Sequence, residues 1–262
     1  MGSEIRFEQV SRRFGAVIAV DGIDLTIAPG SFVALVGESG SGKSTLLRAI
    51  NRLDEGVGSE RVGRDGRVTI GGEDVAAAPL TQLRRRIGYV FQSIGLFPHT
   101  DVAANIAIGR RARGETLAEA EIAALLEQVG LPADFATRMP RELSGGQAQR
   151  VGIARALAIE PEILLLDEPF AALDPVTRDA LGKTVRALHE ARALTTILVT
   201  HDMAEAMLLA DRVIVLAAGR VVADASPAEL ASGRGGAEAE ALVAIPREQA
   251  RRIAGLGAKA DR

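Results

Sequence analysis

Hydrophobic and polar residues alternate along the first 30 positions, as in Ile5-Phe7 and Ile23-Leu25-Ile27. A period of two residues is typical of strands, because successive side chains point to opposite faces of a sheet. The pattern therefore predicts a small unit of antiparallel strands at the start of the chain, and Phe14 lies within this unit.

Unbroken apolar runs replace the alternation further along the chain. Short runs of this kind are typical of strands that are buried on both faces, as in a parallel sheet. The runs cover residues 31–36, 87–91, 163–166 and 196–199, with a further strand expected near 68–70. Helical patterns over 46–53 and 175–192 alternate with them, so we expect an α/β fold with a parallel sheet.

A helical pattern dominates from about residue 93 to residue 142. Thr116 and Glu119 have the spacing of a capping box, which predicts a helix that ends at Gly130 and Pro132. The apolar residues on one face of this helix are Ile122, Leu125, Leu126 and Val129. A second helix is expected to open at Thr100-Asp101-Val102.

The segment Gly37-Glu38-Ser39-Gly40-Ser41-Gly42-Lys43-Ser44-Thr45 fits the pattern G-x-x-x-x-G-K-[ST] between a predicted strand and a predicted helix. Backbone N–H groups can wrap a polyphosphate where glycines leave room and allow positive φ angles. Lys43 would bring its charge to the β- and γ-phosphate oxygens, and the Ser44 hydroxyl would ligate Mg²⁺. A glycine- and serine-rich turn is the alternative, but the strand–loop–helix context favours a phosphate loop in which all nine residues bind the nucleotide.

Asp167 and Glu168 end the apolar run at 163–166, so both carboxylates fall at the carboxyl edge of a buried strand. This edge is where open α/β sheets bind ligands. Asp167 is the candidate for holding Mg²⁺ through water, and Glu168 for activating the attacking water as a general base. A solvated turn after the strand is the alternative interpretation, which the presence of a phosphate loop disfavours.

A third motif is Leu143-Ser144-Gly145-Gly146-Gln147. Ser144 and Gln147 have the spacing of an S-x-x-Q capping box, so a capped, glycine-rich helix start is one interpretation. The apolar positions of that helix are Val151, Ala154 and Leu157. In order and spacing, the three motifs resemble those of the ATP-binding-cassette (ABC) ATPases, and the resemblance covers about residues 4–225.

This resemblance implies a RecA-like P-loop NTPase core with a parallel sheet, an N-terminal antiparallel β sub-domain and an α-helical sub-domain inserted at about residues 93–150. It also implies that two ATP molecules with Mg²⁺ lie between two copies of the chain arranged head to tail. The helix start would then face the γ-phosphate on the second chain through Ser144, Gly145, Gly146 and Gln147. Residues 226–262 would form a short C-terminal tail without a separate regulatory domain.

Four further residues match the family's pattern one by one. Phe14 takes the place of the aromatic residue that stacks on adenine, and Gln92 that of the lid glutamine near Mg²⁺ and the attacking water. Asp174 would communicate across the dimer, and His201 would contact the γ-phosphate. Each also has an ordinary interpretation, because a lone Phe is usually in a core and an Asp before a helix usually caps it. The predicted catalytic residues are Glu168, His201, Gln92 and Lys43, and the predicted metal ligands are Ser44, Gln92 and Asp167.

Composition, at 47% hydrophobic and 25% charged residues, is typical of a soluble α/β enzyme. No apolar run reaches about 18 residues and no basic start precedes an apolar segment, so we predict neither a membrane span nor a secretory signal. Zero cysteines and three scattered histidines give no thiolate site or zinc motif. The expected location is the cytoplasm.

Basic and acidic residues number 31 and 34 and are interspersed, so no nucleic-acid surface is predicted. Phosphate contact is one interpretation of the clusters Arg84-Arg85-Arg86 and Arg110-Arg111. With only 3% aromatic residues to stack on bases, a solvated face or contact with acidic neighbours is favoured.

A chain without a membrane span can move solute only by acting on separate membrane subunits. In the resembled family, a cleft beside the lid glutamine receives a short cytoplasmic helix of the permease. The corresponding stretch here is residues 92–104, where Ile94, Leu96 and Phe97 are large apolar residues in a loop-like segment. We therefore expect two permease subunits to dock there, with the chain on the inner face of the cell membrane and a solute-binding protein as an indirect partner. Internal packing of the sub-domain is the alternative.

Residues 50–53, 93–99 and 169–179 resemble the ATPases of osmoprotectant importers, which take up glycine betaine, choline and related quaternary amines. Residues 54–66 form a longer connection than is usual there, and Ala148 stands where these relatives have Gln. An importer for another solute, such as phosphate or an amino acid, and a non-transport ABC ATPase that regulates a membrane protein complex remain as alternatives.

Overall fold

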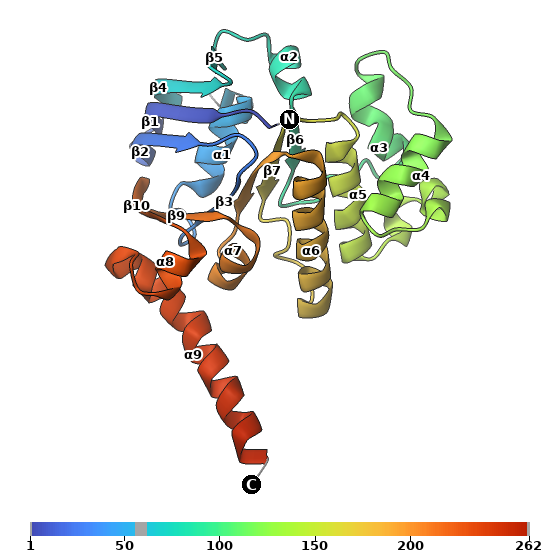
Figure 1. The fold of residues 1–262 in the computed structure, drawn as a ribbon. Coiled ribbons are helices and arrows are strands. Elements are labelled where there is room, and N and C mark those ends of the chain that lie inside the picture. The colour runs from blue at the N-terminus through green and yellow to red at the C-terminus, as the bar shows by residue number, and fades with distance from the viewer. Residues whose placement is uncertain (1, 56–61, 261–262) are drawn as a thin grey trace.

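Two β-sheets organise the computed structural model, which describes residues 2–55 and 62–260 (Figure 1). The four-stranded sheet has the order β2-β1-β4-β5 and the six-stranded sheet the order β10-β9-β3-β8-β7-β6. The strands of the first are β1 (Ile5–Phe14), β2 (Val17–Ile27), β4 (Val62–Ile70) and β5 (Glu73–Asp74). Those of the second are β3 (Phe32–Val36), β6 (Ile87–Val90), β7 (Ile163–Asp167), β8 (Thr195–Val199), β9 (Arg212–Ala217) and β10 (Arg220–Ala225).

Strand directions confirm both predictions made from hydrophobic periodicity. β1 and β2 pair antiparallel with Ile5 opposite Ile27, and β1 pairs antiparallel with β4. In the six-stranded sheet, β9, β3, β8, β7 and β6 run parallel, and β10 joins the edge antiparallel to β9. The carboxyl ends of the parallel strands therefore meet at one edge of this sheet.

Burial on both faces explains the unbroken apolar runs. Along β3, Val33 and Leu35 belong to a core shared with the four-stranded sheet and α1 (Lys43–Asn51), whereas Phe32, Ala34 and Val36 belong to a second core with the helices of the other face. Every residue of β3, β7 and β8 is buried. Such strands need hydrophobic side chains at consecutive positions.

The helices lie on both sides of this sheet and beside it. α3, α4 and α5 follow β6 and precede β7 in the chain, and they gather beside the sheet as a separate helical group, drawn in green to yellow-green in Figure 1. The helices of this group are α3 (Val102–Arg111), α4 (Glu119–Gln128) and α5 (Gly145–Leu157). The remaining helices are α2 (Leu80–Arg85), α6 (Pro175–Arg192), α7 (Met203–Leu209), α8 (Pro227–Ala231) and α9 (Gly236–Ala260). Short 3₁₀ segments cover Leu53–Glu55, Ala133–Thr137 and Pro140–Glu142. Within the described ranges, none of these helices combines the length and hydropathy that crossing a bilayer requires.

Two local predictions are wrong. Thr116 does not start α4: the helix begins at Glu119, and the Glu121 carboxylate accepts a hydrogen bond from the Ala118 N–H at 2.8 Å. A carboxylate three residues after the cap satisfies a free N–H there, which moves the start of the helix. The predicted connection over 54–66 is also too long, because 62–66 belong to β4, while 56–61 lie outside the described residues.

The C-terminal tail is more ordered than its glycine- and alanine-rich sequence indicated. After α8, the chain forms the 25-residue helix α9, which extends away from the body in Figure 1. Ala239 and Val243, four residues apart, are buried against the large core at the start of α9. The first turns of α9 therefore pack against the body of the fold.

Candidate nucleotide site

The phosphate loop connects β3 to α1 at the carboxyl edge of the parallel sheet. Gly37 and Gly42 have φ angles of 149° and 103°. A Cβ at Gly37 would overlap the carbonyl oxygen of Leu216, and one at Gly42 would overlap that of Ala19. These two glycines are therefore required by the close approach of β9 and β2 to the loop as well as by their backbone angles.

Lys43 lies inside the curve of this loop. Its Nζ donates hydrogen bonds to the carbonyl oxygens of Gly37 and Glu38, each at 2.8 Å, and the residue is buried. Burial lowers the pKa of Lys43, while the charges of Glu168 and Asp167 oppose that shift. Two carbonyl oxygens of the loop therefore hold the ammonium group, which also interacts with the charges of Glu168 and Asp167.

Asp167 ends β7 and is buried, with both carboxylate oxygens engaged. Ser44 Oγ donates to Oδ1 at 2.6 Å. Tyr89 donates its hydroxyl to Oδ2 at 2.8 Å, and Arg48 Nη2 lies 3.3 Å from the same oxygen. Burial, together with the Asp167 charge, raises the pKa of Tyr89 well above its ordinary range. Oδ1 therefore faces the phosphate loop, and Oδ2 is fixed from the side of β6 (Tyr89) and α1 (Arg48).

Sequence reasoning missed Tyr89 and Arg48. Tyr89 is the chain's single tyrosine, and it lies on β6, whose pairing with β7 sets Tyr89 beside Leu165. A polar aromatic residue within a buried strand was the signal that could have identified it, because a buried Tyr hydroxyl usually finds a partner.

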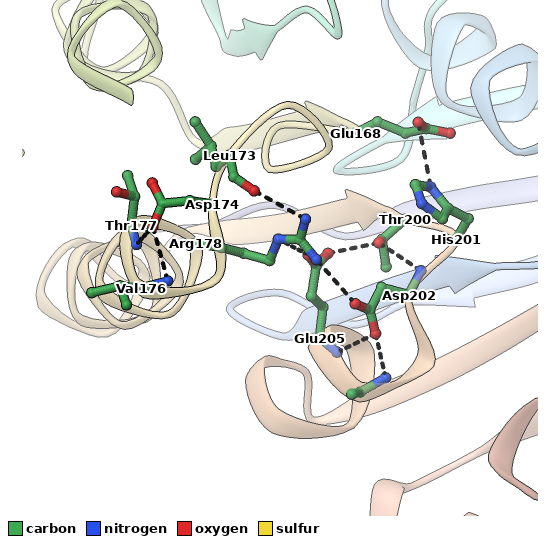
Figure 2. Close-up of polar contacts among 11 residues, drawn as sticks. Glu168, Leu173, Asp174, Val176, Thr177, Arg178, Thr200, His201, Asp202 and Glu205 are labelled. Atoms are coloured by element: carbon green, nitrogen blue, oxygen red, sulfur yellow. Dashed lines mark hydrogen bonds and ion pairs between the residues drawn. The ribbon is translucent and has the colours of Figure 1, made fainter. Parts of the chain in front are cut away.

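Gln92, Glu168 and His201 come together beyond the ends of three neighbouring strands. Gln92 Nε2 donates to Glu168 Oε2 at 3.2 Å. His201 Nδ1 lies 3.5 Å from the same oxygen, as Figure 2 shows. Glu168 has a φ of 47°, a left-handed angle that costs a non-glycine residue of the order of 1–3 kcal/mol. Its backbone N–H donates to the Val199 carbonyl at 3.0 Å, which holds this turn against β8.

The third motif lies elsewhere in the chain, at the start of α5. Gln147 N donates to Ser144 Oγ at 3.3 Å and Ser144 N to Gln147 Oε1 at 2.9 Å, so the predicted capping box is confirmed. A Cβ on Gly146 would lie 2.7 Å from Thr177 Cγ2, whereas one on Gly145 would meet nothing within 4 Å. Ser144 and Gly145 are exposed, so this surface is open to a second molecule.

Asp174 is the N-cap of α6 and accepts from the N–H groups of Val176 and Thr177 at 3.1 and 3.0 Å (Figure 2). Asp202 caps α7 in the same way, through Ala204 N at 2.8 Å. The capping interpretation of Asp174 is therefore confirmed, and its dimer role stays a prediction. Phe14 is 42% exposed at the end of β1, free of the core, and its contact with adenine likewise stays a prediction.

Arginine clusters contact acidic neighbours, as expected. Arg86 pairs with Glu73 at 2.8 Å and Glu162 at 3.1 Å, and Arg110 pairs with Glu115 at 2.7 Å as well as with Glu160.

A pocket of about 370 Å³ opens on the flank of the phosphate loop and is lined by the end of β9 and the start of α9.

A strand, a glycine loop around a buried lysine, and an aspartate that accepts from the serine of that loop define a P-loop nucleotide-binding protein of the α/β class. Residues 20–171 match the family model described as ABC transporter. The chain belongs to this family, as an ATP-binding cassette ATPase.

Relatives of similar sequence are ATP-binding subunits of importers. The glycine betaine uptake system ATP-binding protein YehX of Escherichia coli is 46% identical over 85% of this chain and 71% of its own length. The glycine betaine/carnitine/choline transport ATP-binding protein OpuCA of Bacillus subtilis is 43% identical over 86% of this chain. The sulfate/thiosulfate import ATP-binding protein CysA of Mycobacterium tuberculosis is 46% identical over 84%. The chain spans only 58% of OpuCA and 60% of CysA.

Solved structures of similar fold include the dimeric bacterial ABC transporter cassette MJ0796, with a TM-score of 0.75 and 33% identity over 85% of this chain and 98% of that one. A post-hydrolysis state of the same dimer, bound to ADP and phosphate, matches equally well. A bacterial Atm1-family exporter with ATP bound has a TM-score of 0.78 and 31% identity over 93% of this chain and 42% of that one.

Proposed function

We propose that this chain is the ATP-hydrolysing subunit of an importer that takes up an osmoprotectant such as glycine betaine or choline through separate permease subunits. One observation carries the hydrolytic part: the Glu168 carboxylate lies within 3.5 Å of both Gln92 and His201, directly after the Asp167 that accepts from Ser44. A general base must lie beside the groups that position its water, and this cluster has that arrangement.

In this proposal each residue takes the role that the family resemblance implies for it. Lys43 binds the β- and γ-phosphates, the loop amides cradle them, and Phe14 stacks on adenine. Glu168 accepts the proton of the attacking water, His201 contacts the γ-phosphate, and Gln92 orients the water.

Ser44, Asp167 and Gln92 would hold Mg²⁺ that arrives with ATP. Their hydroxyl, carboxylate and amide oxygens are the ligands that this cation prefers, and Ser44 Oγ already lies 2.6 Å from Asp167 Oδ1. When bound, the ion neutralises charge on the phosphates.

A second copy of the chain completes the site in this proposal. Ser144 and Gly145 are exposed at the start of α5, and the four amides of a helix start are suited to an anion. The dimeric state of the similar cassette supports a head-to-tail pair in which Ser144, Gly145, Gly146 and Gln147 contact the nucleotide on the partner.

The permease is proposed to dock on the segment 92–104. Hydrogen bonds from the side chains of Asn105 and Arg155 hold the backbone of this segment in place. Asn105, fully buried, accepts from Phe97 N at 2.7 Å and donates to the Phe97 carbonyl at 3.1 Å. Arg155 donates to the carbonyls of Ile94 and Gly95 at 2.9 and 2.7 Å. Leu96 packs on the core while Phe97 is 42% exposed, so an ordered loop presents an apolar group to a partner.

The identity of the transported solute is inferred only from similarity to other importer ATPases, because an ATPase subunit does not contact the solute. Glycine betaine and choline proteins support the osmoprotectant proposal, together with the motif likeness over 93–99 and 169–179. Sulfate importers of equal identity make another solute the second candidate. We place the chain on the inner face of the cell membrane, with a solute-binding protein as an indirect partner.

The test is a pull-down of the tagged Glu168→Gln chain from native membranes with Mg-ATP, analysed by mass spectrometry. We expect a multi-span permease, together with a solute-binding protein whose purified form binds glycine betaine or choline. The Phe97→Ser variant in the same background should lose the permease and keep ATP binding. Recovery of only soluble or single-span partners would refute the importer proposal, and a solute-binding protein specific for sulfate would refute the cargo.

A further inference from the structure

Arg178 connects three segments on the side of the site away from the phosphate loop (Figure 2). It lies in the first turn of α6, and its Nη2 donates to the Leu173 carbonyl at 3.1 Å, one residue before the cap Asp174. Its Nη1 lies 3.4 Å from Asp202 Oδ2, and its Nε lies 3.4 Å from Glu205 Oε1. One guanidinium group therefore contacts the turn before α6, the loop after β8 and the helix α7.

Hydrogen bonds extend from these contacts to the loop that carries His201. Thr200 Oγ1 donates to Glu205 Oε2 at 2.7 Å and accepts from Asp202 N at 3.0 Å. His201 stands between Thr200 and Asp202, so both of its neighbours are held by this network. Its own ring is 62% exposed and lies 3.5 Å from Glu168. The position of His201 therefore depends on residues that Arg178 holds.

Charge and burial make the Arg178–Glu205 contact costly to remove. The Glu205 side chain is only 11% exposed, and burial raises its pKa above the ordinary range. A buried carboxylate needs a cation or donors to stay ionised, and removal of one partner leaves the other unpaired. Arg178 is the cation within ion-pair distance of Glu205 in the described part of the chain.

The network is incompletely packed on the side of Glu168. Among the described residues, Arg178 Nε has no aligned hydrogen-bond partner although it is buried. A cavity of about 10 Å³ lies between Glu168, His201, Arg178 and Glu205. This is about the smallest space that holds one water molecule. The guanidinium group is therefore separated from Glu168 and His201 only by this small cavity, and it contacts the loop that carries His201.

We propose that Arg178 is a positioning residue that couples the Asp174 turn to His201 and Glu168. A shift of the Leu173 carbonyl displaces the guanidinium group, which changes its contacts with Asp202 and Glu205 and so the place of His201. The inference rests on ATP hydrolysis by this chain and not on the identity of a permease, so a failed search for membrane partners would leave it standing.

A purely structural role is the competing interpretation, and a matched variant on the same helix separates the two. Arg186, also on α6, pairs with Glu190 at 2.8 Å and with Asp211 at 2.7 Å, away from the Glu168 cluster. Arg178→Gln and Arg186→Gln each remove one guanidinium group that bridges α6 to a neighbouring segment. Only the first removes a link to the His201 loop.

For Arg178→Gln we expect kcat for ATP hydrolysis to fall by roughly 10- to 100-fold, because small displacements of catalytic groups cost that much. KM and ATP affinity should change by less than about twofold, since the phosphate loop is untouched. Arg178→Lys should recover part of kcat, because it keeps the charge but not the forked contacts. Arg186→Gln should keep kcat while lowering Tm.

Two results would overturn the proposal. One is Arg178→Gln with wild-type kcat and only a lowered Tm, which is the behaviour expected of a structural contact. The other is equal loss of kcat in Arg178→Gln and Arg186→Gln. If Arg178→Gln does not fold, Glu205→Gln gives the same decision, because it keeps the shape of the side chain and removes the charge. Lowered kcat at constant KM supports the proposal, and unchanged kcat contradicts it.

Discussion

Replacement of Glu168 by glutamine lowers ATP turnover by about 10²- to 10⁴-fold, the range that removal of a general base costs. The amide cannot accept the proton of the attacking water, whereas its size and its hydrogen bond to Gln92 are retained. Glu168 faces Gln92 at 3.2 Å and His201 at 3.5 Å, so no other group needs to move. Phosphate release under saturating Mg-ATP measures this loss.

ATP binding by Glu168→Gln should stay within about threefold of wild type, because an interaction needed only in the transition state leaves the ground state unchanged. Glu127→Gln is the matched control, since Glu127 is exposed on α4 and does not belong to the cluster of Gln92, Glu168 and His201. A Glu168→Gln chain that turns over ATP at the control's rate would remove Glu168 from the base role.

Lys43→Ala abolishes nucleotide binding at micromolar concentrations. The variant loses a full charge at the phosphates, and removal of one partner of a desolvated charge pair costs about 2–5 kcal/mol, or roughly 30-fold to several thousand-fold in Kd. Lys43 also donates to the carbonyls of Gly37 and Glu38, so the curve of the loop loses its internal support. Titration calorimetry with ATP gives both Kd and stoichiometry.

Lys183→Ala is the control for this second change. Lys183 lies exposed on α6 and pairs with Asp179 in the i,i+4 relation at 2.7 Å. Its replacement by alanine therefore removes the same kind of side chain, but from a solvated helix face. We expect its Kd for ATP to equal that of the wild type. A folded Lys43→Ala chain that binds ATP as tightly as Lys183→Ala would show that the loop is not the phosphate site.

The sequence predicted those features of the fold that depend on residues close together in the chain, such as helix starts and buried strands. Asp174 followed by Pro175 predicted the start of α6, because a capping side chain and a proline in the first turn both favour it, and the helix spans Pro175–Arg192 as expected. The strands were found for a similar reason, since burial on both faces imposes apolar residues at consecutive positions. Thr116 shows the limit: Glu119 lies three residues after Thr116 and Glu121 three residues after Ala118, and spacing does not decide which pair starts the helix.

Long-range partners could not be predicted in this way. Tyr89 is 78 residues from Asp167, Arg48 is 119 residues from it, and Arg178 is 24 residues from Asp202. No periodic pattern connects such pairs, because their contacts arise only when strands and helices pack. Resemblance to a family identified the motif residues but not these supporting side chains, which are recognised from the geometry around Asp167 and His201.

Light scattering of the Glu168→Gln chain, with and without Mg-ATP, measures whether two copies enclose the nucleotide. We expect the mass to double with ATP and to remain that of one chain without it. Gly145→Trp in the same background should stay at the mass of one chain while keeping ATP binding, because the space around Gly145 is open within a single chain and would be closed by a partner. A Glu168→Gln chain that binds ATP and stays at the mass of one chain at all concentrations would contradict the head-to-tail site.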